Sequence, residues 1–166
     1  MATNHCEKLT KGLREAPLKS VRERQMFVAW LDSFTDIKGC IVEGLQKASE
    51  ATDWLMFDMY VLAASRHPSK LYTAVLCDVL DQQIDDVNNE DIVDLLGGIG
   101  DQAAVHCLEG TLWWQPPWDE YRQLGVKVVW ALAAIGTPDA LAVLRDAAQS
   151  EAAEIRRAAA EELEGA

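Results

Sequence analysis

The sequence lacks any apolar run of about 18 residues, which is the length that a membrane-spanning helix needs. Its first residues, Met1 to Lys8, also lack the apolar centre of a secretory signal peptide. No stretch alternates apolar and polar residues for long enough to predict a β-strand. We therefore expect a cytoplasmic protein that is built from helices and has no membrane partner.

Motifs of common enzyme chemistry are missing as well. The HExxH and CxxC signatures of metal and thiol sites do not occur. The acids of residues 81–92 have a calcium-like spacing, but they lack the central glycine and closing glutamate of an EF-hand loop. The glycines of residues 97–100 stand at a helix end, not at the strand-to-helix turn of a phosphate-binding loop. We predict no enzymatic activity, no catalytic residue, no metal site and no cofactor.

The chain has few cysteines, and none has a second cysteine close to it in sequence. Cys6, Cys40, Cys77 and Cys107 are 30 to 37 residues apart. Isolated cysteines of this kind are usually buried and behave as small apolar residues. We expect four reduced thiols, as in a cytosolic protein.

Basic residues are absent from the middle of the chain. Residues 71–121 contain eleven acidic residues and neither lysine nor arginine, so they carry nearly all of the net charge of −12. A segment of one sign steers oppositely charged molecules toward it, which favours a basic protein as partner. It disfavours nucleic acid, because phosphates are also negative. The alternative is that the charge only keeps the protein soluble.

What the sequence does contain is a repeated helix–turn–helix pattern, clearest around Gly136. Leu124, Val128 and Leu132 recur at helical spacing and form one apolar stripe. Gly136 follows, where a left-handed helix end needs a residue without Cβ. Thr137 can then cap a second helix that has Pro138 at its first position.

The same pattern recurs along the chain. Residues 96–105 align with residues 132–141 at an offset of 36, and a last half-repeat follows at an offset of 31. Repeats of this length with two helices each are typical of α-solenoids. The sequence predicts one all-α domain over residues 1–166, with about four to five antiparallel helix pairs. The repeats are clearest over 88–166 and degenerate over 18–82.

Polar residues mark the expected starts of other helices. Asp36, Asn88 and Asp101 each stand before an apolar stripe, as does either Thr52 or Asp53. Such side chains accept hydrogen bonds from the free amides of a helix's first turn. We expect nine or ten helices in all.

Two segments, residues 123–136 and 154–163, resemble the first helices of short bacterial HEAT-like repeats. Those helices contain an apolar residue, a basic residue, alanines and then leucine with glycine, as in QLGVKVVWALAAIG. The resemblance implies an α-solenoid. The repeat is also similar to that of deoxyhypusine hydroxylase, a metalloenzyme that uses several His-Glu pairs. This chain has no such pairs, so the resemblance does not imply that activity. Bilin lyases share the repeat, so a bilin-lyase-like subunit is one alternative.

Three tryptophans and two prolines fill the junction between two repeats, at residues 113–121. The prolines prevent a continuous helix and stiffen the segment. We expect one helix to end near Leu112 and the next to begin near Asp119, whose carboxylate can cap it. The tryptophans either plug the groove between repeats or form a binding hot spot. Trp118 is expected to be the more exposed, and Trp113 or Trp114 the plug.

Together these features predict a non-enzymatic scaffold that presents an acidic, tryptophan-containing face to a basic protein. An alternative with the same chemistry is an immunity or inhibitor protein that neutralises a basic toxin or nuclease. The predicted contact residues are Asp78, Asp81, Asp85, Asp86, Glu109, Trp113, Trp114, Trp118, Asp119 and Glu120.

Overall fold

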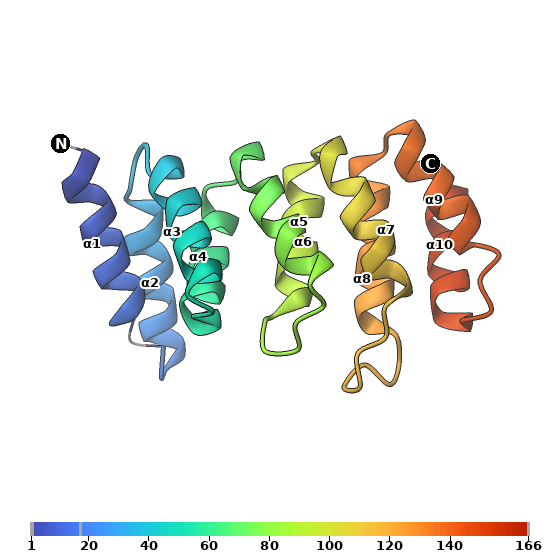
Figure 1. The fold of residues 1–166 in the computed structure, drawn as a ribbon, viewed down its shortest axis with the longest axis horizontal. Helices are drawn as coiled ribbons and strands as arrows, with labels where there is room; N and C mark the ends of the chain where they lie inside the picture. Colours follow the sequence, from blue (N-terminus) through green and yellow to red (C-terminus); the bar gives the residue numbers. More distant parts are fainter. Residues whose placement is uncertain (1, 17, 166) are drawn as a thin grey trace. The chain divides into compact units, whose positions relative to one another are not determined.

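The computed structural model describes residues 2–16 and 18–165, and in these residues it contains helices and no strand (Figure 1). The prediction of an all-α solenoid is confirmed. None of the described helices is both long and apolar enough to cross a membrane. The ten α-helices and two short 3₁₀ helices of this part of the chain are α1 (Ala2–Arg14), α2 (Val21–Asp32), α3 (Lys38–Glu50), α4 (Trp54–Arg66), η1 (Lys70–Tyr72), α5 (Thr73–Asp81), α6 (Asn89–Ile99), η2 (Gln102–Ala104), α7 (Val105–Trp113), α8 (Gln123–Ile135), α9 (Pro138–Ala147) and α10 (Ala153–Gly165).

Several helix starts follow the capping chemistry of the sequence. Asp53, Asn88 and Asp101 occupy the N-cap positions of α4, α6 and η2, and each side chain accepts a hydrogen bond from a backbone amide. The prediction for Asp36 is wrong. Ile37, which is fully buried, takes the N-cap position of α3, and Asp36 has a left-handed backbone with φ of 57°. Burial of the isoleucine at the turn replaces a side-chain cap there.

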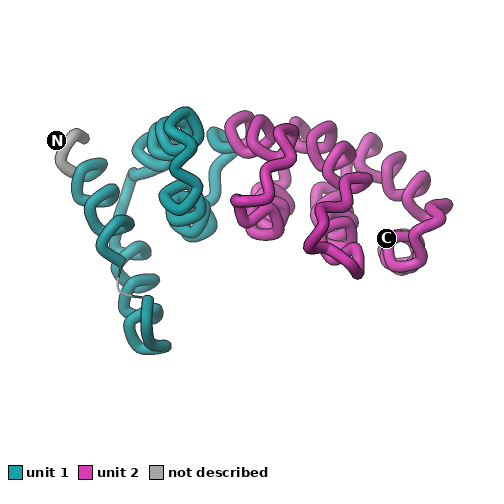
Figure 2. Tube along the Cα trace, turned by 60° about the horizontal axis from the view of Figure 1, so that its bottom comes forward, with its two compact units in different colours: residues 1–72 teal, residues 73–166 magenta. Residues whose placement is uncertain are grey.

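The chain forms two compact units, residues 1–72 and 73–166 (Figure 2). In unit 1, α3 packs along α4, α1 packs against both of them, and α2 contacts α4. Fully buried side chains such as Leu9 of α1, Ile41 of α3 and Phe57 of α4 form its core. The guanidinium of Arg66 donates two hydrogen bonds of 2.7 and 2.8 Å to Asp32, which ties α4 to α2. The single domain expected from the sequence stays a prediction.

Unit 2 has two layers of helices. Helices α6, α8 and α10 pack side by side in one layer, and α5, α7 and α9 form the other (Figures 1 and 2). Helix α8 is central, since it packs against α6, α7, α9 and α10. Its approach to α6 is close, because a Cβ on Gly97 would lie 2.9 Å from Cα of Ala131.

The repeated turns have the predicted geometry. Gly136 has a φ of 63°, and its N–H donates to the carbonyl of Leu132 at 3.0 Å. Gly100 occupies the equivalent turn between α6 and η2, with a φ of 67°. Thr137 caps α9, and Pro138 is the first residue of that helix. A residue with Cβ is strained at a positive φ, so both turns depend on glycine.

The prediction of reduced cysteines is wrong. All four cysteines are paired, Cys6 with Cys40 and Cys77 with Cys107. The first disulfide joins α1 to α3 and the second joins α5 to α7, so each one links alternate α-helices that pack against each other. A spacing near one repeat length produces this pairing, because it places equivalent positions next to each other. The cytoplasmic location stays a prediction without support from the cysteines, since stable disulfides are typical of oxidising compartments.

Candidate functional site

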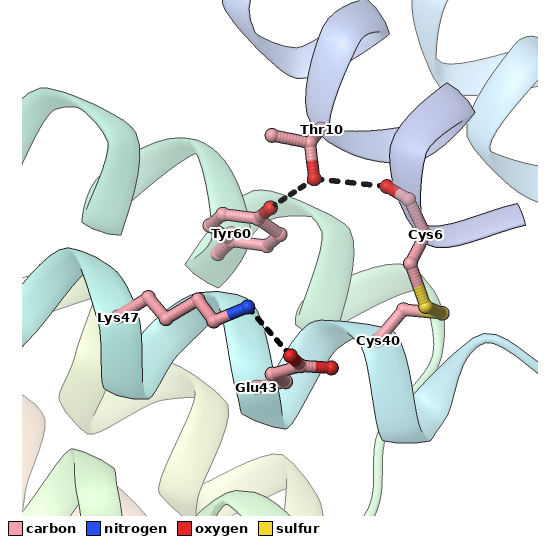
Figure 3. The surroundings of a disulfide bond; sticks show 6 residues. All are labelled: Cys6, Thr10, Cys40, Glu43, Lys47 and Tyr60. Atoms are coloured by element: carbon pink, nitrogen blue, oxygen red, sulfur yellow. Dashed lines mark hydrogen bonds and ion pairs between the residues drawn. A yellow bond between two sulfur atoms is a disulfide. The ribbon is translucent and has the colours of Figure 1, made fainter. Parts of the chain in front are cut away.

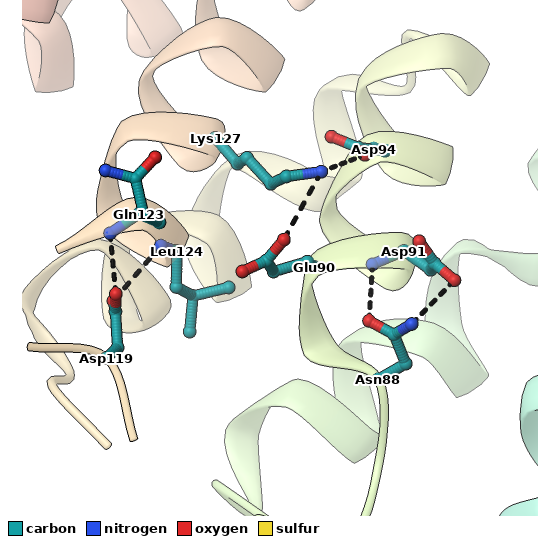
Figure 4. A network of polar contacts seen from close by, with 8 residues as sticks. All are labelled: Asn88, Glu90, Asp91, Asp94, Asp119, Gln123, Leu124 and Lys127. Atoms are coloured by element: carbon teal, nitrogen blue, oxygen red, sulfur yellow. Dashed lines mark hydrogen bonds and ion pairs between the residues drawn. The ribbon is translucent and has the colours of Figure 1, made fainter. Parts of the chain in front are cut away.

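The structure divides the eleven acids of residues 71–121 into engaged and free carboxylates. Lys127 of α8 lies between Glu90 and Asp94 of α6, with its Nζ 3.6 Å and 2.5 Å from their carboxylate oxygens (Figure 4). Burial acts to lower the pKa of Lys127, but the hydrogen bond and charge of Asp94, together with Glu90, outweigh it and raise the pKa. Glu90 and Asp94 therefore join two repeats, and Lys127 offsets one of their two negative charges.

Asp91 and Asp101 are also engaged in local structure. The N–H of Asp91 donates to Asn88, and the Asn88 amide donates back to the Asp91 carboxylate at 2.7 Å (Figure 4). Asp101 accepts from the N–H of Ala103 and from the hydroxyl of Thr73. These carboxylates hold helix ends in place.

Asp119 is only 4% exposed, which corrects its place among the contact residues. Its carboxylate accepts hydrogen bonds from the backbone N–H groups of Gln123 at 2.6 Å and Leu124 at 3.1 Å (Figure 4). The physical reason is that Arg122, at the N-cap position of α8, has no side-chain acceptor for the first free amides. Asp119 supplies that acceptor from three residues upstream. Helix α8 consequently begins four residues later than expected.

Six carboxylates remain free and exposed, and all six belong to the predicted contact set. None of them makes a hydrogen bond or an ion pair with the described residues. They are Asp78, Asp81, Asp85, Asp86, Glu109 and Glu120, and we call them the acidic surface.

The acidic surface occupies one layer and one end of unit 2. Asp78 and Asp81 lie on α5, and Glu109 lies on α7 in the same layer. Asp85 and Asp86 lie in the loop after α5, and Glu120 lies in the loop after α7. Both loops emerge at the same end of unit 2 (Figure 1).

The tryptophan loop, residues 113–122, lies at that same end. Trp113 is 45% exposed and Trp118 is 47% exposed, whereas Trp114 is partly buried. Trp118 is exposed as expected, but Trp113 is exposed to nearly the same extent, and Trp114 is the most enclosed of the three. Two half-exposed indoles beside free carboxylates form an amphipathic surface, which is common at protein interfaces.

Hydrogen bonds hold the tryptophan loop in one conformation. The guanidinium of Arg122 donates to Gln115 Oε1 and to the carbonyl of Leu112, each at 3.3 Å. The amide of Gln115 donates to the carbonyl of Asp119 at 3.2 Å. Sequence reasoning missed this role of Arg122, whose backbone is left-handed with a φ of 58°. A loop ordered before binding loses little entropy when a partner docks.

Two exposed aromatic residues also escaped the sequence analysis. Tyr121 is 66% exposed and Trp130 of α8 is 51% exposed. Trp130 was detectable, because it stands two residues from both Val128 and Leu132 and must face away from their buried stripe. Among the described residues, no group of three or more histidine, cysteine or acidic side chains could hold a metal ion.

Comparison with known proteins agrees with this repeat architecture. A family model described as HEAT repeats matches residues 73–164, which is more than half of the chain and nearly all of unit 2. A search of curated proteins finds no match for the chain.

Proposed function

Because the chain belongs to the HEAT repeat family, we propose that it is a non-enzymatic scaffold whose acidic surface and tryptophan loop bind a protein with a basic surface. HEAT repeats are commonly protein-interaction scaffolds, since stacked repeats offer long continuous surfaces. The proposal assigns the contact to the layer of α5 and α7 and to the adjoining loops of unit 2.

The observation that supports this proposal most is the sorting of the carboxylates. Five of the eleven acids of residues 71–121 accept capping hydrogen bonds or form ion pairs. The other six are free and lie on α5 and α7 and in the loops that follow these helices. Free carboxylates that are grouped in one layer and at one end repel each other, and a cationic partner reduces this repulsion. Trp113 and Trp118 beside them supply apolar contact area. Charge would then govern the association rate, and the indoles the lifetime of the complex.

Charge reversal with a matched control tests the proposal. The test variant carries Asp81→Lys, Asp85→Lys and Asp86→Lys in the acidic surface. The control carries Glu151→Lys, Glu161→Lys and Glu164→Lys, which are exposed acids in and before α10. Both variants have the same net charge, so any difference between them reports position and not total charge.

The readout begins with the tagged parent chain, which captures its partner from a lysate of the source cells. Association rates of that partner are then measured over a range of salt concentrations. We expect the test variant to associate at least about tenfold more slowly at low salt and to lose most of its salt dependence, as steering predicts. The control should behave like the parent. Equal effects of both triple variants would mean that only net charge matters. A basic toxin or nuclease as the captured partner would favour the inhibitor alternative.

A further inference from the structure

Unit 1 contains a groove of about 710 Å³ between α1, α3 and α4, far in sequence from the acidic surface. The Cys6–Cys40 disulfide forms part of its wall, and Tyr60 of α4 forms another part (Figure 3). The Tyr60 ring lies against Gly44, where a Cβ would be 2.2 Å from the ring. The volume is within the range of small-molecule sites, which is about 300–1,000 Å³.

The disulfide in this wall is accessible. Cys6 and Cys40 are both partly exposed, and both line the groove. The threonine hydroxyl of Thr10 donates to the carbonyl of Cys6 at 2.8 Å, so the Tyr60 hydroxyl, at 2.7 Å, donates to Thr10 (Figure 3). These bonds fix the turn of α1 that carries Cys6. A disulfide held open to a cavity is an electrophile for any thiolate that can enter.

The charges around the groove favour an anionic ligand. Lys11, Arg14 and Lys47 line it, together with Glu7 and Glu43. Lys47 is 2.6 Å from Glu43 and is neutralised by it (Figure 3). Lys11 and Arg14 are exposed and form no ion pair with the described residues. The groove therefore holds three bases against two acids, beside a bond that reacts with thiolates.

We propose that this groove binds small anionic thiols and that Cys6–Cys40 is the disulfide that they reduce. A thiolate sulfur attacks Sγ of Cys6 or Cys40, forms a mixed disulfide and releases the other cysteine as a thiolate. A second small thiol attacks the mixed disulfide, which leaves two reduced cysteines and one oxidised small-molecule disulfide. Lys11 and Arg14 attract the carboxylate and thiolate groups of the incoming molecule. The site is independent of the partner surface proposed for unit 2.

The second disulfide is a built-in reference with acidic surroundings. Cys77 is partly exposed, and Cys107 is only 1% exposed. Asp78 follows Cys77 directly, and Asp81 one turn later reaches within 4.0 Å of a Cβ built on Gly110. With no lysine or arginine in residues 71–121, an anionic thiolate is repelled from Cys77–Cys107.

The experiment compares glutathione, which is anionic, with cysteamine, which is cationic, on the folded full chain. Free thiols are trapped by alkylation at successive times, and peptide mass spectrometry gives the reduction rate of each disulfide. The quantity compared is the rate at Cys6–Cys40 divided by the rate at Cys77–Cys107, in which the intrinsic reactivity of each thiol cancels. We expect this ratio to be at least about fivefold higher with glutathione at low salt, the order expected from two unit charges acting across several ångströms of water.

Matched variants assign the effect to the groove. Lys11→Gln with Arg14→Gln should remove most of the glutathione preference. Lys19→Gln with Arg22→Gln should keep it, because these exposed residues of unit 1 do not line the groove. Equal ratios for the two thiols in the parent chain would overturn the proposal. Equal loss of the preference in both double variants would overturn it as well.

Discussion

The close packing of α6 on α8 predicts opposite effects for the same substitution at two neighbouring glycines. In Gly97→Ala the new methyl would lie 2.9 Å from Cα and 3.0 Å from Cβ of Ala131, so one helix backbone must move. In Gly98→Ala the new methyl meets nothing within 4 Å. Both residues belong to α6, and neither has a positive φ. The two variants therefore differ only in what the methyl contacts.

The magnitudes follow from two opposing terms. Alanine stabilises a helix by about 0.5–1 kcal/mol relative to glycine. Overpacking a tight contact costs about 1–3 kcal/mol. Gly98→Ala should therefore be stabilising by about 0.5 kcal/mol, since it lies near the helix end. Gly97→Ala should be destabilising by about 1 kcal/mol or more.

Chemical denaturation followed by far-ultraviolet circular dichroism measures both free energies of unfolding. For a chain of this size a change of 1 kcal/mol shifts the melting temperature by about 2–4 °C, so thermal melts should rank the variants in the same order. If Gly97→Ala proves as stable as Gly98→Ala, the close approach of α6 to α8 is wrong. A destabilised Gly98→Ala would instead show that this part of α6 is not helical.

Three further predictions address the turns, the pH dependence and the tryptophan loop. Gly136→Val should lower the free energy of unfolding by about 1 kcal/mol or more, because a β-branched residue is strained at a φ of 63°; an unchanged denaturation midpoint would contradict this. Burial raises the pKa of Tyr72 to about 12, so its neutral phenol stabilises the fold below the unfolded value near 10, and this contribution is lost as pH rises toward 12. Tyr72→Phe should remove that part of the alkaline loss of stability, as measured by denaturation at successive pH values. Trp118→Ala should weaken the partner complex by about 2 kcal/mol and barely change the melt, whereas Trp114→Ala, at a more enclosed position, should lower the melting temperature.

Local chemistry made the glycine turns and several helix starts predictable. A glycine after an apolar stripe, then Thr137 and Pro138, determines a helix end and a helix start within a few residues, and the structure has both. Asp36 shows the limit of this reasoning. Its neighbour Ile37 is fully buried and takes the N-cap position. Burial of that side chain depends on tertiary packing, which local sequence does not show.

The sequence predicted the composition of the candidate surface, but not which of its acidic residues are free to bind a partner. The sequence identifies an acidic segment with tryptophans, yet it cannot show which carboxylates already have partners. Lys127 forms ion pairs with Glu90 and Asp94 from a different repeat. Asp119 caps α8, as its position suggested, and is buried by doing so. The disulfides could not be predicted for the same reason. Two cysteines pair only where the fold brings their helices together, and the sequence does not show which helices are neighbours.

The positions of the disulfides should determine which helices of unit 2 unfold first. The Cys77–Cys107 bond encloses α6 in a covalent loop, and no cysteine lies beyond residue 107. Helices α9 and α10 lie outside that loop, and α10 packs on α8 and α9. Stacked repeats are held mainly by their neighbours, and parts of a repeat array can open separately. Under heat or mechanical tension, α9 and α10 should therefore open before the crosslinked α5–α7 segment.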